Sequence, residues 1–188
     1  MINLQFAMNQ LTESQSTIWT IPGMSHPPRY TARPLPPYSY VTRQHPHPLR
    51  DPAGHSFGHD PEPVVPLDES NWPTNQAWLY AIDLFNHGFY WEAHEAWEGL
   101  WHAAGRRGST ADFLKGLIKL AAAGVKAKEG RPAGVRRHAA RATVLLAAEQ
   151  GKCLYGVDVD ALVAECQRLE GDQKADWTRL RVSLHGLT

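Results

Sequence analysis

Prolines are distributed unevenly along this chain of 188 residues, and their positions limit where helices can form. Twelve of the fourteen prolines lie in residues 25–73, and Pro132 is the only one after them. Proline lacks a backbone N–H and clashes with the preceding helical turn, so residues 25–73 are predicted to be extended rather than helical. Five aromatic residues give this arm anchors on a folded body: Tyr30, Tyr38, Tyr40, Phe57 and Trp72.

Helical patterns begin immediately after the arm. Apolar residues recur there at spacings of three and four, which is typical of amphipathic helices. A first helix is predicted to end near residue 86, and four more are predicted at about residues 90–104, 111–129, 132–150 and 159–169. The predicted fold class is therefore all-α, a bundle of about five helices with short connections and an extended Pro/His-rich N-terminal arm.

Residues at the ends of these segments support the helix boundaries. The expected N-terminal caps are Thr74 or Asn75, Ser109 or Thr110, and Asp158. Pro132 suits the first turn of a helix, where its missing N–H has no partner to lose. Gly116 and Gly124 lie on one face of the third helix and would let a neighbouring helix approach closely.

Length and composition indicate one domain with extensions. A hydrophobic content of 43% is enough to form a core. We predict a disordered extension over residues 1–24, the arm over 25–73 and a helical core over 74–151. Residues 152–188 are expected to form a C-terminal helix and a tail that pack on the core.

Charge and cysteine content bound the location and the partners of the chain. The net charge is zero, which makes no case for binding to nucleic acid or to a membrane surface. No segment is apolar for long enough to cross a bilayer. The two cysteines, Cys153 and Cys166, fit a reducing compartment. We therefore expect a cytoplasmic protein with no membrane partner.

The predicted second helix carries the most informative polar residues. Its apolar stripe consists of Tyr90, Ala93, Trp97, Leu100 and Trp101. His94 falls inside the edge of this stripe, and Glu98 lies beside it one turn further on. Ionisable groups at a buried face are costly unless they are paired or bound. The conflict between pattern and burial indicates a functional site.

The spacing of these polar residues is compatible with a metal or acid/base site. His94 and Glu98 are four residues apart, and His138 lies on the apolar face of the fourth helix. We predict metal ligation by His94, Glu98 and His138, with a divalent transition metal as the ion. Catalytic roles are assigned to His94, Glu95 and Glu98, and cofactor contacts to Trp97, Trp101 and Lys119. Glu92, on the far side of the helix, is the least expected participant.

The alternative is a structural one, in which His94 and Glu98 form a buried hydrogen-bonded pair or Glu98 pairs with a basic residue. The pocket of the functional interpretation would lie between the second, third and fourth helices. Trp91, Trp97 and Trp101 would line it. Neither the ligand nor the reaction follows from these residues.

Two further clusters have weaker signals. His45, His47, His55 and His59 lie within fifteen residues of the arm, and with Asp51 they could ligate zinc, iron or copper. Their spacing matches no standard site, so a solvated linker is favoured. Six basic residues between positions 126 and 141 could bind an anion or RNA. No aromatic residues are interleaved with them, so a solvated helix surface is favoured and nucleic acid is not expected.

The second and third helices resemble a known family. The resemblance rests on the string Phe85-Asn86-x-Gly88-x-Tyr90-x-Glu92-Ala93-His94-Glu95-x-Trp97-Glu98-x-x-Trp101, followed by Phe113-Leu114-x-Gly116-Leu117-Ile118. This pattern is similar to the domain of unknown function 309 family and extends over roughly residues 74–147. The resemblance implies an all-helical fold and marks His94, Glu95 and Glu98 as signature positions. It implies no particular reaction.

Two functional classes remain open from the sequence. The first is a metal-binding or small-ligand domain, with or without catalysis. The second is a protein-interaction module, because the short turn at Gly88 also resembles helical hairpins of the tetratricopeptide type. Only one such unit is visible, whereas a repeat protein needs about three. An RNA-associated protein is a weaker third possibility, and the oligomeric state does not follow from the sequence.

Overall fold

The computed structural model describes residues 27–60, 62–171 and 181–187. It contains five α-helices, one short 3₁₀ helix and one small hairpin within these ranges. The elements are α1 (Gln76–Asn86), α2 (Tyr90–Ala103), α3 (Ser109–Lys128), α4 (Pro132–Leu146), η1 (Ala147–Glu149), β1 (Cys153–Leu154), β2 (Val157–Asp158) and α5 (Val159–Gly171). The prediction of an all-α bundle of about five helices is confirmed.

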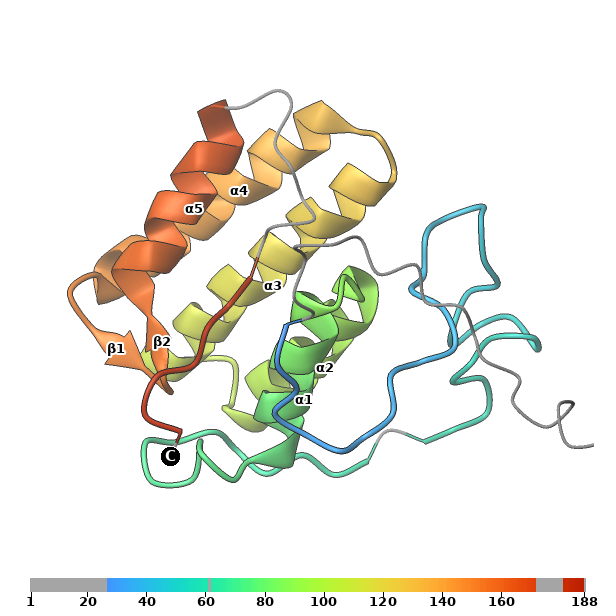
Figure 1. Cartoon of the computed structure of the whole chain (residues 1–188), viewed down its shortest axis with the longest axis horizontal. Coiled ribbons are helices and arrows are strands. Elements are labelled where there is room, and N and C mark those ends of the chain that lie inside the picture. The colour runs from blue at the N-terminus through green and yellow to red at the C-terminus, as the bar shows by residue number, and fades with distance from the viewer. Residues whose placement is uncertain (1–26, 61, 172–180, 188) are drawn as a thin grey trace, which may run out of the picture.

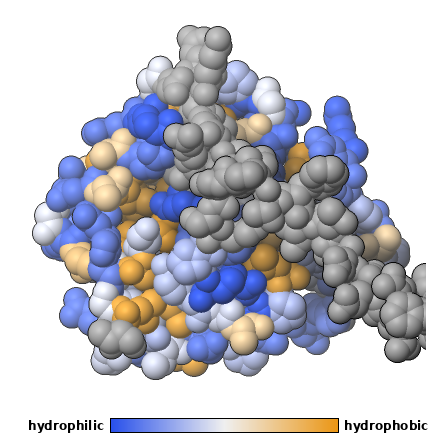
Figure 2. Space-filling view, in the orientation of Figure 1, coloured by the Kyte–Doolittle hydropathy of each residue, from blue (hydrophilic) through white to orange (hydrophobic). Residues whose placement is uncertain are grey.

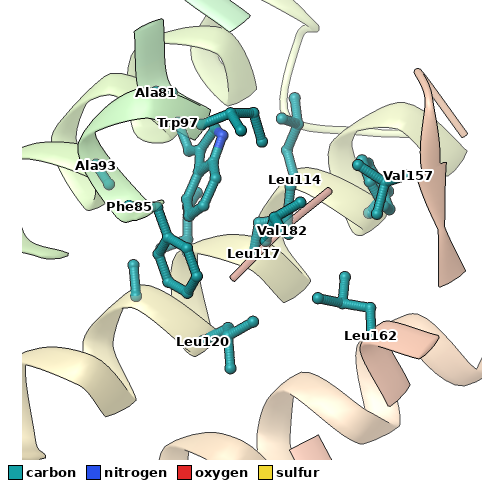
Figure 3. Close-up of a cluster of buried hydrophobic side chains, with 14 of the residues drawn as sticks. Ala81, Phe85, Ala93, Trp97, Leu114, Leu117, Leu120, Val157, Leu162 and Val182 are labelled. Carbon is teal, nitrogen blue, oxygen red and sulfur yellow. The ribbon is translucent and has the colours of Figure 1, made fainter. Parts of the chain in front are cut away.

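The long helix α3 lies in the middle of the bundle (Figure 1). It packs against α2 on one side and α4 on the other, while α1 packs on α2 and α5 on α4. Trp78, Phe85, Trp97 and Phe113 are fully buried between these helices. Figure 3 shows Phe85 and Trp97 beside the leucines of α3, with Val182 and Leu162 completing the same core. Hydrophilic residues cover much of the face in Figure 2, with apolar residues visible between them.

Two glycines of α3 allow this close packing. A Cβ atom at Gly124 would lie 2.5 Å from the ring of Tyr90 on α2. One at Gly116 would lie 2.6 Å from the side chain of Leu146 on α4. The predicted close approach at these small residues is therefore found on both sides of α3.

Two of the three predicted helix caps are present in the structure, and one is wrong. Asn75 caps α1, because its Oδ1 accepts from the backbone N–H of Trp78 at 3.1 Å. Asp158 caps α5 through the N–H of Ala161 at 3.0 Å. The predicted cap of α3 is wrong: Gly108 precedes the helix without a side-chain cap. Thr110 instead shares a hydrogen bond of 2.6 Å with the hydroxyl of Tyr155.

The hairpin between α4 and α5 was not predicted. The α-helix α4 ends at Leu146, short of the expected residue 150, and continues as the 3₁₀ turn. Leu154 then pairs with Val157 across Tyr155 and Gly156, whose φ angles of 52° and 80° are both positive. Such a two-residue turn suits the twist of a hairpin, but strands of two residues are too short to show alternation.

The arm contains no helix or strand within residues 27–60 and 62–75, as expected. Its start is fixed by Asp83 of α1, whose carboxylate is fully buried. Asp83 accepts from the backbone N–H groups of Tyr30 at 2.7 Å and Thr31 at 2.9 Å and from the Thr31 hydroxyl at 2.7 Å. Arg29 adds an ion pair, with its Nε 3.1 Å from Asp83 Oδ2.

The C-terminal segment reaches the same side of the bundle. Asn86 at the end of α1 donates to the carbonyl of Val182 at 2.9 Å and accepts from its N–H at 2.8 Å. The Tyr30 hydroxyl of the arm accepts from the N–H of Leu184 at 3.3 Å. The predicted disordered extension, residues 1–24, lies outside the described residues, as does the start of the predicted tail. None of the described helices is long and apolar enough to cross a membrane.

Gly124→Ala is expected to lower the free energy of unfolding by about 1–3 kcal/mol, because the new methyl group would overlap the stiff ring of Tyr90. Gly99→Ala on α2 is the matched control, since its Cβ would lie 3.5 Å from Val64, an ordinary contact. That change should be neutral or stabilising by up to about 1 kcal/mol through helix propensity. Urea denaturation measures both, and equal effects would contradict the packing argument.

Candidate functional site

Three potential metal ligands converge on the outer part of α2. One ligand atom from each of His94, Glu95 and Glu98 lies within 4.8 Å of the other two. The helix brings them together because each residue turns by about 100°, which puts Glu98 about 40° from His94 and 60° from Glu95. All three side chains are half-buried. The signature positions therefore form one polar cluster at the edge of the apolar face.

The His94 imidazole has an unused nitrogen. Its Nδ1 lies 3.4 Å from Oε1 of Glu95, close enough for an ion pair when the ring is protonated. This nitrogen is shielded from solvent and makes no hydrogen bond to any described residue. A shielded ring nitrogen without a hydrogen-bond partner is available to accept a proton or a metal ion.

His138 and Lys119 lie in a groove formed by α3 and α4. The groove has a volume of about 480 Å³ and is also lined by Arg137, Ala140, Arg141 and Val144. Burial lowers the pKa of His138 from its ordinary value of 6.5, and the positive charges of Lys119 and Arg137 lower it further. His94 also contributes to this shift, so its imidazole lies within electrostatic reach of His138. His138 is nevertheless outside the group of three ligand atoms on α2.

The three tryptophans predicted to line a pocket occupy different environments. Trp97 is fully buried in the core, with its ring centroid 5.3 Å from that of Phe85 (Figure 3). Trp101 is half-buried beneath the cations of Arg106 and Lys115, which lie 5.6 and 5.9 Å from its ring centroid. Trp91 packs edge-on against a ring of the arm, that of His47, at 5.4 Å. Their predicted contacts with a cofactor stay predictions.

The buried contacts of Glu92 with the arm were not predicted from the sequence. Its side chain is buried, and Oε1 accepts from the backbone N–H of Tyr40 at 2.8 Å. The same oxygen lies 3.3 Å from Nε2 of His55, which is also buried. The other oxygen, Oε2, has no hydrogen-bond partner among the described residues. On the helical wheel, Glu92 faces away from the helical core, so it is the least expected participant. The arm covers this face of α2 and buries Glu92 there.

The arm histidines pack against aromatic rings instead of converging on one point. The His45 ring stacks on Tyr38 at 5.1 Å, and His55 meets the same ring edge-on at 4.8 Å. His47 lies between Tyr40 and Trp91, while His59 is exposed. In the part of the chain that the structure describes, they form no group of three ligand atoms and do not join the α2 cluster. The predicted solvated linker is therefore wrong for this segment, because His55 is buried and His47 packs against Trp91 of α2.

The basic residues at the end of α3 and just after it have partners within the fold. Lys126 Nζ lies 2.7 Å from Oε2 of Glu129, and Arg131 Nε lies 3.5 Å from the same oxygen. Lys128 donates to the Ser39 hydroxyl of the arm at 2.9 Å, and burial lowers its pKa. These contacts support a structural role for this end of the basic run. On α2, His102 is likewise occupied, because Arg106 Nε donates to its Nδ1 at 2.8 Å.

The helices and the His94–Glu95–Glu98 cluster define an all-helical domain with a polar site on its second helix. Residues 78–138 match the sequence model of the family described as "Domain of unknown function (DUF309)". The match extends from α1 into α4, and it confirms the resemblance predicted from the signature residues. No curated protein matches the chain.

Glu92→Gln is expected to loosen the arm, because the amide cannot replace the carboxylate beside His55 and adds a buried donor. The loss in unfolding free energy should be on the order of 1–3 kcal/mol, the usual cost of an unsatisfied buried polar group. Faster proteolysis within residues 40–60 should accompany it. Glu69→Gln, at an exposed position of the same segment, is the control. Unchanged proteolysis in the Glu92 variant would contradict the docking role.

The lowered pKa of His138 predicts a pH dependence of stability. The unfolded chain takes up this proton first, near pH 6.5, so the contribution of His138 is present above that pH and is lost as the pH falls towards the folded pKa. NMR titration of the ring should give a pKa below 6.5, and Lys119→Gln should raise it. A value at or above 6.5 in the unaltered protein would contradict the electrostatic argument.

Proposed function

We propose that this domain binds a divalent transition metal ion through His94, Glu95 and Glu98. The convergence of the three ligand atoms within 4.8 Å is the observation that carries the proposal. The shielded Nδ1 of His94 supports it, because this nitrogen makes no hydrogen bond to a described residue that would compensate for its lost hydration.

The donor set fits such an ion. Imidazole and carboxylate groups together suit zinc, iron or manganese. Ligands bound at about 2.0–2.2 Å lie roughly 3–4 Å from one another. The 3.4 Å between His94 Nδ1 and Glu95 Oε1 is already in this range, and a ligand atom of Glu98 lies within 4.8 Å of one on each of the other two residues. The proposed site uses Glu95 in place of His138, which lies outside the group.

Three protein ligands leave coordination positions open for water or a substrate. Sites with three protein ligands are typical of metals that act chemically, whereas structural zinc sites are usually closed by four. A bound metal would supply a Lewis acid and an activated water, which suits hydrolytic chemistry, or redox chemistry with iron or manganese. The chain's own contribution is to orient His94 and the two carboxylates from one rigid helical turn.

The alternative of a protein-interaction module has less support. A partner peptide would need a free face of the α1–α2 hairpin. The arm of the same chain already contacts this hairpin at Asp83, Trp91 and Glu92. Binding of a peptide there would have to displace buried hydrogen bonds.

Metal content of the full chain, purified without a histidine tag or chelator, tests the proposal. Elemental analysis is expected to find close to one zinc, iron or manganese per chain. The double variant His94→Ala, Glu98→Gln should lose the metal, while its helical content, measured by circular dichroism, stays unchanged. Added metal at a hundredfold excess over its Kd should stabilise the unaltered protein by about 2.7 kcal/mol.

His102→Ala is the matched control, since this histidine lies on the same helix, is exposed and bonds to Arg106. It should keep the metal. Absence of metal in the unaltered protein and no stabilisation on adding it would overturn the proposal. If neither protein holds metal and the His94→Ala, Glu98→Gln variant is only less stable, His94 and Glu98 form a structural pair.

A further inference from the structure

The charged side chains that line the groove between α3 and α4 are all basic. Lys119 comes from α3, and Arg137, His138 and Arg141 come from α4. Arg137 and Arg141 are four residues apart, which puts both guanidinium groups on one ridge of the helix. No acidic residue lines the groove. Its remaining lining residues are Ala140 and Val144, of which Val144 is 63% exposed.

These cations lack the partners that their neighbours have. Lys126 and Arg131 pair with Glu129, and Lys128 donates to Ser39 of the arm. By contrast, Lys119, Arg137 and Arg141 form no ion pair with any residue in the described ranges 27–60, 62–171 and 181–187. Like charges without counter-charges repel one another. An anion bound in the groove would therefore reduce the electrostatic repulsion among these cations.

We propose that this groove binds a small molecule carrying a phosphate monoester. A phosphate monoester is largely a dianion at neutral pH, and the planar guanidinium groups of Arg137 and Arg141 can each donate two hydrogen bonds to it. Lys119, which lines the same groove from α3, adds a third positive charge. Ala140, Val144 and the aliphatic stems of the long side chains offer apolar surface to the organic part of the ligand.

The size of the groove favours a small molecule over a nucleic acid. It is a shallow depression of about 480 Å³ that is largely open to solvent, which is enough room for a phosphate group and a small organic part. A nucleic-acid surface would need a basic stripe along many phosphates and aromatic side chains for stacking. Here Lys126 and Arg131 share one ion-pair partner, Glu129, Lys128 donates to Ser39 of the arm, and the net charge of the chain is zero.

The groove does not depend on the metal proposed at His94, Glu95 and Glu98. None of these three residues lines it. Binding can therefore be measured on the full chain in the presence of EDTA, so failure of one proposal leaves the other standing.

Calorimetric titration with phenyl phosphate tests the groove, with phenol and inorganic phosphate as comparison probes. Phenyl phosphate is expected to bind more tightly than either probe, because only it uses both the cations and the apolar surface. The double variant Arg137→Gln, Arg141→Gln should bind it at least about tenfold more weakly, which corresponds to about 1.4 kcal/mol.

The matched control is Arg50→Gln, Arg107→Gln. It removes the same number of positive charges from exposed positions outside the groove. This variant should bind phenyl phosphate within about twofold of the unaltered chain, and neither variant should melt at a lower temperature than the unaltered chain.

Three results would overturn the proposal. In the first, phenyl phosphate does not bind, or binds no more tightly than inorganic phosphate. In the second, both double variants weaken binding equally, so the effect is one of net charge. In the third, a single-stranded oligonucleotide binds more tightly than phenyl phosphate, with a steep salt dependence lost in the Arg137/Arg141 variant, which would assign the surface to nucleic acid.

Discussion

Two buried carboxylates hold the N-terminal arm against the helices, and the position of the polar residues depends on them. Asp83 of α1 receives two backbone N–H groups, the Thr31 hydroxyl and Arg29. Glu92 of α2 receives the N–H of Tyr40 and contacts His55. A carboxylate buried without such partners would cost several kcal/mol. The helical bundle and the arm therefore stabilise each other, because each satisfies groups that the other buries.

The helix α2 has two polar faces: the arm covers one, and the other carries the proposed metal ligands. Glu92 and His94 are two residues apart, which places them about 200° from each other around the helix. Glu92 is covered by the arm, whereas His94, Glu95 and Glu98 gather at the opposite edge of the apolar stripe. Packing of Tyr90 against Gly124 fixes the rotation of α2 on α3. The same contact thus determines which carboxylate is buried and which ligands stay accessible.

Much of the fold was predictable from periodicity and from breaker residues. Glycine and proline positions located the ends of α1 to α4 to within a few residues, because these residues change backbone freedom locally. The hairpin at Cys153–Asp158 was missed, since two-residue strands show no alternation. The cap of α3 was also misassigned, because Thr110 bonds to Tyr155, which is distant in sequence. A hydrogen bond between residues far apart in the chain leaves no pattern in the sequence around either of them.

For the candidate site, the sequence by itself determined that Glu98 lies beside His94, because residues four apart are neighbours on a helix surface. It also determined that residues 25–73 could not be helical. Only the tertiary structure decided that the arm docks on Glu92, that Trp97 belongs to the core, and that Lys119 meets Arg137 and Arg141 across a groove. These outcomes depend on packing between segments far apart in the chain, where periodicity carries no information about the partner.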